Sequence, residues 1–163
     1  MENTYLKLHS LLRMAAALIA LVVFISMFIT KQVVHPDFPD RAFCMWNEAF
    51  FDDADAGTKG TVLGFIGYLF VLFGGLAGLA FVFIDELIGK DLTKKLSFIA
   101  GGVIAVGAVM MLLTGVLFRG MNNDGGFGLR DYGLAAGPIV FAILSFVAAA
   151  CNAAAPVLED KGF

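Results

Sequence analysis

The stretch GTVLGFIGYLFVLFGGLAGLAFVFI, residues 60–84, contains no charged side chain. About 20 consecutive apolar residues are enough for a helix to cross a hydrocarbon core about 30 Å thick. Three other runs without charge, at residues 14–30, 96–118 and 132–158, are near or above that length. The sequence therefore predicts four transmembrane helices.

The composition agrees with this interpretation. Of the 163 residues, 60% are hydrophobic and only 15% are charged, unlike an ordinary soluble domain. We expect an all-α integral membrane protein: a four-transmembrane-helix bundle with a short amphipathic helix in its first lumenal or extracellular loop. It forms one domain, residues 1–163, and its spans cover approximately residues 11–30, 60–84, 96–118 and 133–156.

The first span follows Lys7 and Arg13, as the apolar part of a signal peptide would follow its basic residues. Its apolar part is longer than the 7 to 15 residues typical of such signals, so we expect it to be retained. Four spans place both termini on one side, together with the turn DELIGKDLTKK at residues 85–95. Because Lys90, Lys94 and Lys95 lie in that turn, the positive-inside rule predicts cytoplasmic termini. We expect a multi-pass protein of a vesicle, an endomembrane or the plasma membrane.

The first loop, residues 31–59, holds the only tryptophan. After Asp40, a plausible helix cap, Phe43, Trp46 and Phe50 recur at i, i+3 and i+7. This spacing predicts a short amphipathic helix whose aromatic face anchors at the membrane interface or contacts a partner. An irregular loop whose aromatic side chains pack on the ends of the spans is the alternative.

The acids of DDADAG, residues 52–57, resemble a calcium loop only superficially. Counted from Asp53, position six is Thr58 instead of glycine and position twelve is Gly64 instead of glutamate, so this is not an EF-hand. A looser calcium site remains an alternative. We favour a structural role, in which acids before the second span interact with the positive end of its helix dipole.

The two cysteines are Cys44, in the first loop, and Cys151, in the fourth span. That separation argues against an intrachain disulfide. Three states of Cys44 stay open: free, lipidated, or paired with another chain.

Small residues at a spacing of four occur in three of the spans, and such faces let helix backbones approach closely in a membrane. We expect helix packing at Gly74, Gly78, Gly101, Ala105, Ala149 and Ala153. Hydrogen bonds between helices are expected from Tyr68, Thr114, Ser145 and Asn152, with a solvated pathway as the less favoured use. At the inner membrane boundary, we expect Arg13 to pair with Asp85 or Glu86.

The spans lack the ionisable groups that transporters, pumps and channels usually carry at membrane depth. His9 and His35 fall on opposite sides of the membrane, and the sequence has no phosphate-binding loop, activated nucleophile or metal-ligand motif. We therefore expect no enzymatic activity, no cofactor and no metal. The expected partners are membrane lipids, other membrane proteins or further copies of the chain, and not nucleic acid.

Four segments, LLRMAAALIALVVF, FCMWN, FVFIDELIG and KDLTKKLSF, resemble the MARVEL-domain proteins, especially the synaptogyrin and synaptophysin branch. The resemblance covers nearly the whole chain. It implies a non-catalytic four-span scaffold or organiser of vesicles and specialised membrane domains. The second loop has no cysteine and the first has one, so the resemblance does not extend to disulfide-pinned loops. The tail VLEDKGF is also too short for a tyrosine-rich recruitment tail.

Two alternatives remain. The claudin and peripheral-myelin type of four-span protein has a first extracellular segment that resembles a small sheet clipped by paired cysteines, and would imply a junction or channel-modulating role. An accessory subunit of a larger membrane complex fits the short loops and small-residue faces equally well.

Overall fold

The structure is a computed structural model that describes residues 7–40, 42–55, 57–123 and 128–161; it does not describe the side chains of Asp85 and Glu86. Within these residues, four helices are long and apolar enough to cross a membrane. They are α1 (Leu8–Ser26), α3 (Val62–Ile88), α4 (Lys90–Met121) and α5 (Ala136–Asp160). The four helices expected from the charge-free runs are therefore confirmed. All four extend beyond the predicted spans at the end that carries the termini.

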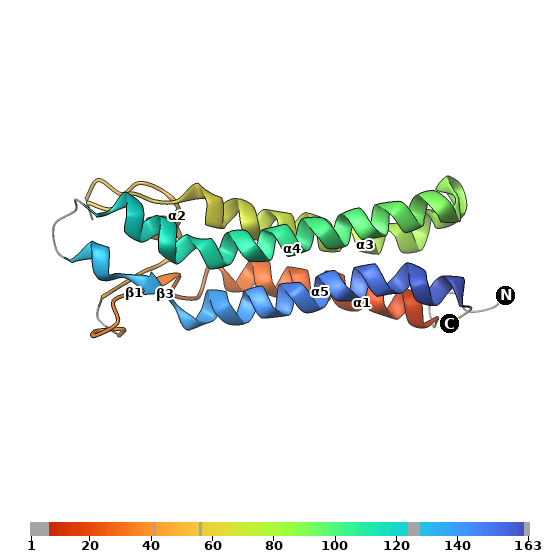
Figure 1. Cartoon of the computed structure of the whole chain (residues 1–163), viewed down its shortest axis with the longest axis horizontal. Helices are drawn as coiled ribbons and strands as arrows, with labels where there is room; N and C mark the ends of the chain where they lie inside the picture. Colours follow the sequence, from red (N-terminus) through yellow and green to blue (C-terminus); the bar gives the residue numbers. More distant parts are fainter. Residues whose placement is uncertain (1–6, 41, 56, 124–127, 162–163) are drawn as a thin grey trace.

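The helices form a four-sided bundle. Each packs against its neighbour in the chain, and α1 closes the bundle by packing against α5. Figure 1 shows both termini at the end where α3 turns into α4, with the two longer loops at the other end. Only Gly89 separates α3 from α4, and its φ of 84° lies in the region that glycine adopts without steric cost.

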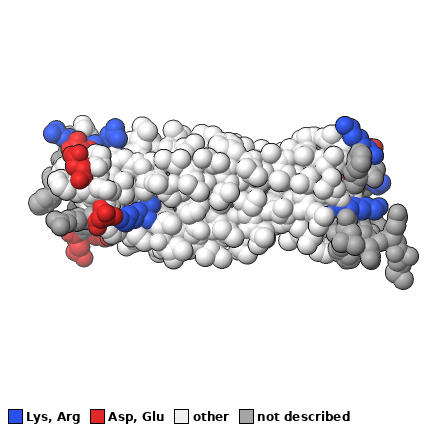
Figure 2. All heavy atoms as spheres, turned by 90° about the horizontal axis from the view of Figure 1, so that it is seen from below, with Lys and Arg blue, Asp and Glu red and all other residues white. Residues whose placement is uncertain are grey.

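Charged side chains gather at the ends of the bundle. In Figure 2, Lys, Arg, Asp and Glu lie at the two ends of the face shown, and none lies along the middle. Such a surface suits a hydrocarbon layer between two aqueous phases.

A small sheet covers the end opposite the termini. Its central strand, β1 (Val33–Val34), lies antiparallel between β2 (Phe43–Cys44) and β3 (Gly133–Leu134). Val33 pairs with Cys44 on one side and with Leu134 on the other. The sheet thus ties the first loop to the segment just before α5. Nothing in the sequence pattern predicted it, because two-residue strands are too short to show an alternation of apolar and polar residues.

The expected amphipathic helix of the first loop is shorter than its pattern suggested. Helix α2 (Trp46–Phe50) has five residues, and Phe43 lies in β2. The prediction that Phe43, Trp46 and Phe50 share one helical face was therefore wrong. The backbone at Phe43 is extended because Phe43 and Cys44 pair with β1 instead of continuing a helix. A 3-10 helix, η2 (Leu129–Asp131), precedes β3.

Candidate functional site: the helix contacts and the aromatic cap

The predicted small residues lie at contacts between helices. A Cβ atom built on Gly101 of α4 would lie 3.0 Å from the carbonyl oxygen of Ala149 and 3.7 Å from the Cβ of Ala153, both on α5. On α3, a Cβ on Gly74 would lie 2.6 Å from Cγ1 of Ile104. These glycines therefore sit where two helices meet with no space for a side chain.

Gly78 and Ala105 complete the predicted set. A Cβ on Gly78 would overlap the amide of Asn152 on α5. Ala105 is partly buried and packs against the core. The predicted helix-packing residues thus contribute to the α3–α4 contact, to the α4–α5 contact and, at Gly78, to the approach of α5 to α3.

Sequence reasoning missed the closest crossing of α3 and α4, at Gly67 and Gly107. A Cβ on Gly67 would lie 2.7 Å from the carbonyl oxygen of Gly107, and a Cβ on Gly107 would lie 2.6 Å from that of Gly67. It also missed Gly75, which packs against Ala16, Ala17 and Ala20 of α1. The sequence did hold a sign of the crossing at Gly67. Gly67 lies seven residues before Gly74, which is about two helical turns, so the two glycines share one face of the helix.

An aromatic cluster, which we name the aromatic cap, joins α1 to α3 through residues of the first loop. Its members are Phe24, Phe28, Trp46, Phe51 and Phe65. The Trp46 ring lies edge-on to Phe28, with centroids 5.1 Å apart, and Phe51 and Phe65 are 5.5 Å apart. Edge-to-face pairs of this kind contribute about 0.5–1.5 kcal/mol each beyond the burial of their area. The cap therefore holds the first loop against the bundle.

The three aromatic residues predicted as one surface have different surroundings. Phe50 is fully buried against Phe65 and Tyr68, whereas Trp46 is partly buried in the aromatic cap. Phe43 lies apart from both, with the Lys31 ammonium 4.5 Å from its ring centroid. Three phenylalanines of the first loop remain exposed, and we name them the loop rim: Phe38 (58% exposed), Phe43 (36%) and Phe51 (40%).

Cys44, in strand β2 of the sheet, is a buried free thiol that is only 4% exposed. Burial, together with a smaller contribution from the neighbouring Glu48 carboxyl, raises its pKa to about 12. Burial also raises the pKa of Tyr132, with smaller contributions from Cys44 and Glu48. Cys44 forms no disulfide with Cys151, as the sequence predicted, and its burial disfavours the lipidated and interchain-paired states.

At the end that carries the termini, Arg13 of α1 is completely buried. Its Nη2 donates to Oε2 of Glu159 at 3.2 Å and to Oγ of Ser97 at 3.4 Å, so one guanidinium links α1, α5 and α4. The partners predicted from the sequence, Asp85 and Glu86, have side chains outside the described residues. Glu159 was overlooked although the four-span topology places it at the same end of the bundle as Arg13.

Of the four polar residues expected to link helices, Asn152 does so: its Nδ2 donates to the carbonyl oxygen of Gly74 on α3 at 3.4 Å. The Tyr68 hydroxyl donates to Oε1 of Gln32 at 3.0 Å and so links α3 to the first loop. The hydroxyls of Thr114 and Ser145 instead donate to carbonyl oxygens one turn earlier in their own helices. These two bonds satisfy the hydroxyls within a helix and do not link two helices.

The loop acids bond to the backbone around them: Asp52 accepts from the Gly60 amide and Asp53 from the Asp55 amide. In the described part of the chain, no group of three or more His, Cys, Asp or Glu residues lies close enough to hold a metal ion. Comparisons of the chain with protein-family models, with characterised proteins and with solved structures find no match.

Proposed function

We propose that this chain is a non-catalytic, multi-pass membrane protein that organises partner proteins in a vesicle or another specialised membrane domain. The observation that carries the proposal is the loop rim, Phe38, Phe43 and Phe51. These phenylalanines stay exposed on a loop that the sheet and the aromatic cap fix to the bundle. Aromatic side chains held on a rigid support are typical contact residues of protein interfaces.

The interior of the bundle supports a structural role better than a transport role. The backbones of α3 and α4 touch at Gly67 and Gly107. The buried Gln32 amide bonds to protein through both its nitrogen and its oxygen, and Nδ2 of Asn152 donates to the Gly74 carbonyl oxygen, although Oδ1 of Asn152 has no hydrogen-bond partner among the described residues. Close backbone contact and polar groups that bond to protein both favour a stable scaffold over a solvated path.

The orientation belongs to the same proposal. Lys90, Lys94 and Lys95 begin α4 at the end that carries the termini, so the positive-inside rule supports cytoplasmic termini and a lumenal or extracellular loop rim. The resemblance to synaptogyrin and synaptophysin supports a vesicle or a specialised membrane domain as the location.

A claudin-like junction or channel-modulating role is the second candidate. The observation that favours it is the three-stranded sheet outside the bundle. Here the sheet is held by its pairing with β3 and not by a pair of cysteines, since Cys44 is free.

The experiment is a purification of the tagged full chain in a mild detergent, followed by mass spectrometry of the chains that co-purify. Phe38→Ala and Phe43→Ala should reduce partner recovery without lowering the abundance of the protein, because neither ring belongs to the aromatic cap. The matched control is Phe98→Ala, which removes a phenylalanine of similar exposure (44%) from α4. One partner in equal amount would favour an accessory subunit. Unchanged recovery in the rim variants, or solute flux through the purified protein in liposomes, would contradict the proposal.

A further inference from the structure

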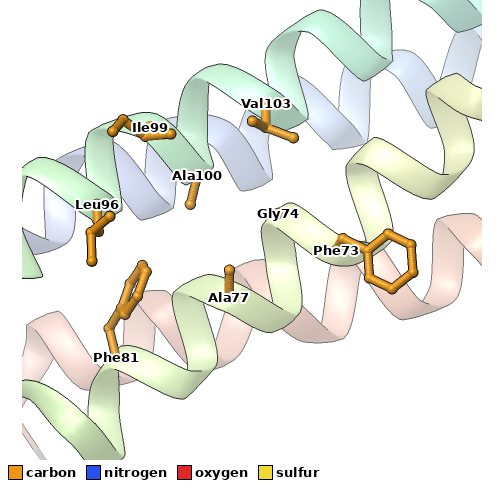
Figure 3. Close-up of a pocket in the computed structure, with 8 residues that line it drawn as sticks. All are labelled: Phe73, Gly74, Ala77, Phe81, Leu96, Ile99, Ala100 and Val103. Carbon is orange, nitrogen blue, oxygen red and sulfur yellow. The ribbon is translucent and has the colours of Figure 1, made fainter.

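An apolar groove lies on the outer surface between α3 and α4 (Figure 3), with a volume of about 250 Å³. Eight apolar residues line it: Phe73, Gly74, Ala77 and Phe81 from α3, and Leu96, Ile99, Ala100 and Val103 from α4. Phe73 and Ile99 are each 60% exposed, so the groove opens away from the bundle. A surface at this position would face the lipid.

The groove follows from the small side chains at its floor. In Figure 3, Gly74, Ala77 and Ala100 occupy the space between the two helices, while Phe81 stands at one end of the groove and Phe73 at the other. Beyond Phe73 the helices touch at Gly67 and Gly107, where backbone meets backbone. The hollow is therefore confined to the part of the α3–α4 hairpin that is nearer its turn.

The length of the groove along the helices favours a lipid chain over a helix of another protein as its occupant. Phe73 and Phe81 are eight residues apart, which is about 12 Å along a helix. One leaflet contributes about half of a hydrocarbon core that is about 30 Å thick. The groove thus matches a single leaflet, whereas a transmembrane partner helix would need a contact surface through both.

The charge at the end of the groove favours a phosphate-bearing headgroup. Exposed Lys95 is four residues before Ile99, so it lies on the same face of α4, and it directly precedes Leu96 at the end of the groove. Lys94 is directed elsewhere, since it pairs with Asp160 of α5. An exposed ammonium at the headgroup level attracts the phosphate of a phospholipid.

We propose that this groove binds one acyl chain of a phospholipid from the leaflet on the side of the termini, with Lys95 at the lipid phosphate. The inference depends on the bundle spanning a membrane. It goes beyond the scaffold proposal, because the loop rim lies at the opposite end of the molecule. Partner recovery through the loop rim can therefore succeed or fail independently of lipid binding in the groove.

The test uses the full chain in nanodiscs that contain phosphatidylglycerol with a photoreactive acyl chain. After illumination, mass spectrometry should find the cross-links concentrated in residues 73–81 and 96–103. Ala77→Phe fills the groove and should reduce this yield about tenfold, because it displaces buried methylenes of the lipid. Lys95→Gln should reduce it by a smaller factor. Ala80→Phe places the same ring on exposed surface of α3 and should leave the yield unchanged.

Circular dichroism and thermal unfolding of each variant show whether the bundle is intact. If Ala77→Phe fails to fold, Ala77→Leu replaces it, with Ala80→Leu as its control. Cross-links spread evenly over all four helices, or a yield at the groove that Ala77→Phe or its replacement leaves unchanged, would overturn the inference. Cross-linking of another protein's helix to residues 73–81 in native membranes would also overturn it.

Discussion

The Arg13 guanidinium donates a hydrogen bond to the Glu159 carboxylate across 3.2 Å, and thereby joins the first and last helices of the bundle. Arg13 is fully buried, and the side chain of Glu159 is 14% exposed. One position further along α5, Asp160 pairs with Lys94 of α4, and these side chains are 56% and 42% exposed. The two neighbouring ion pairs therefore differ mainly in burial.

We predict that Glu159→Gln lowers the free energy of unfolding by about 3–5 kcal/mol, because it leaves the buried guanidinium without this carboxylate. The control, Asp160→Asn, should cost about 0–1 kcal/mol, because the pair it breaks is screened by water. Thermal or denaturant unfolding in detergent measures both. Equal losses would contradict the account.

Arg13→Glu should be partly rescued by Glu159→Arg, whereas rescue by Asp85→Arg would support the partner predicted from the sequence.

A second prediction concerns the crossing of α3 and α4. Gly107→Ala should lower the midpoint of thermal unfolding, because the added methyl group meets the backbone of Gly67, which cannot rotate away. Gly102→Ala makes the same chemical change on the same helix, where nothing lies within 4 Å of the added atom. It should leave the midpoint unchanged or raise it slightly. A Gly102 variant as unstable as the Gly107 variant would show that the crossing is not closely packed.

A third prediction concerns the buried hydrogen bond between Tyr68 and Gln32. Tyr68→Phe removes the donor and leaves the buried Oε1 of Gln32 without it, which should cost about 1–3 kcal/mol. The ring is retained, so its packing against Phe50 should not change. Unfolding of this variant at the wild-type midpoint would mean that water or another group replaces the hydroxyl.

A fourth prediction concerns the reactivity of Cys44. Only the thiolate reacts with maleimides, so a thiol whose pKa is about 12 should be labelled slowly at pH 7 in the folded protein. Raising the pH from 7 to 9 should increase its labelling rate without reaching a plateau, because this range lies well below its pKa. A cysteine introduced by Asp55→Cys in the exposed part of the loop should react quickly, and its rate should level off near the ordinary thiol pKa of about 8.5. Equally fast labelling of Cys44 in the folded chain would contradict its burial.

The sequence was sufficient to predict the four helices, because each charge-free run is long enough to be identified without its neighbours. It also indicated Gly74, Gly78 and Gly101 as packing positions, since their spacing is local. The sheet and the Arg13–Glu159 pair could not be found in this way. β3 lies about a hundred residues after β1, and Glu159 is 146 positions from Arg13. Contacts between such distant segments depend on how the helices are arranged in space, which no local pattern shows.

The central claim is that the bundle spans a membrane, with the loop rim on one side and the termini on the other. Its most direct test is the labelling of single introduced cysteines with an impermeant maleimide, with the wild-type chain as the blank. Across a sealed membrane, only one of the two sites, Asp55→Cys and Asp91→Cys at the start of α4, should be labelled, and the other should be labelled only after permeabilisation. Labelling of both sites before permeabilisation would contradict the claim.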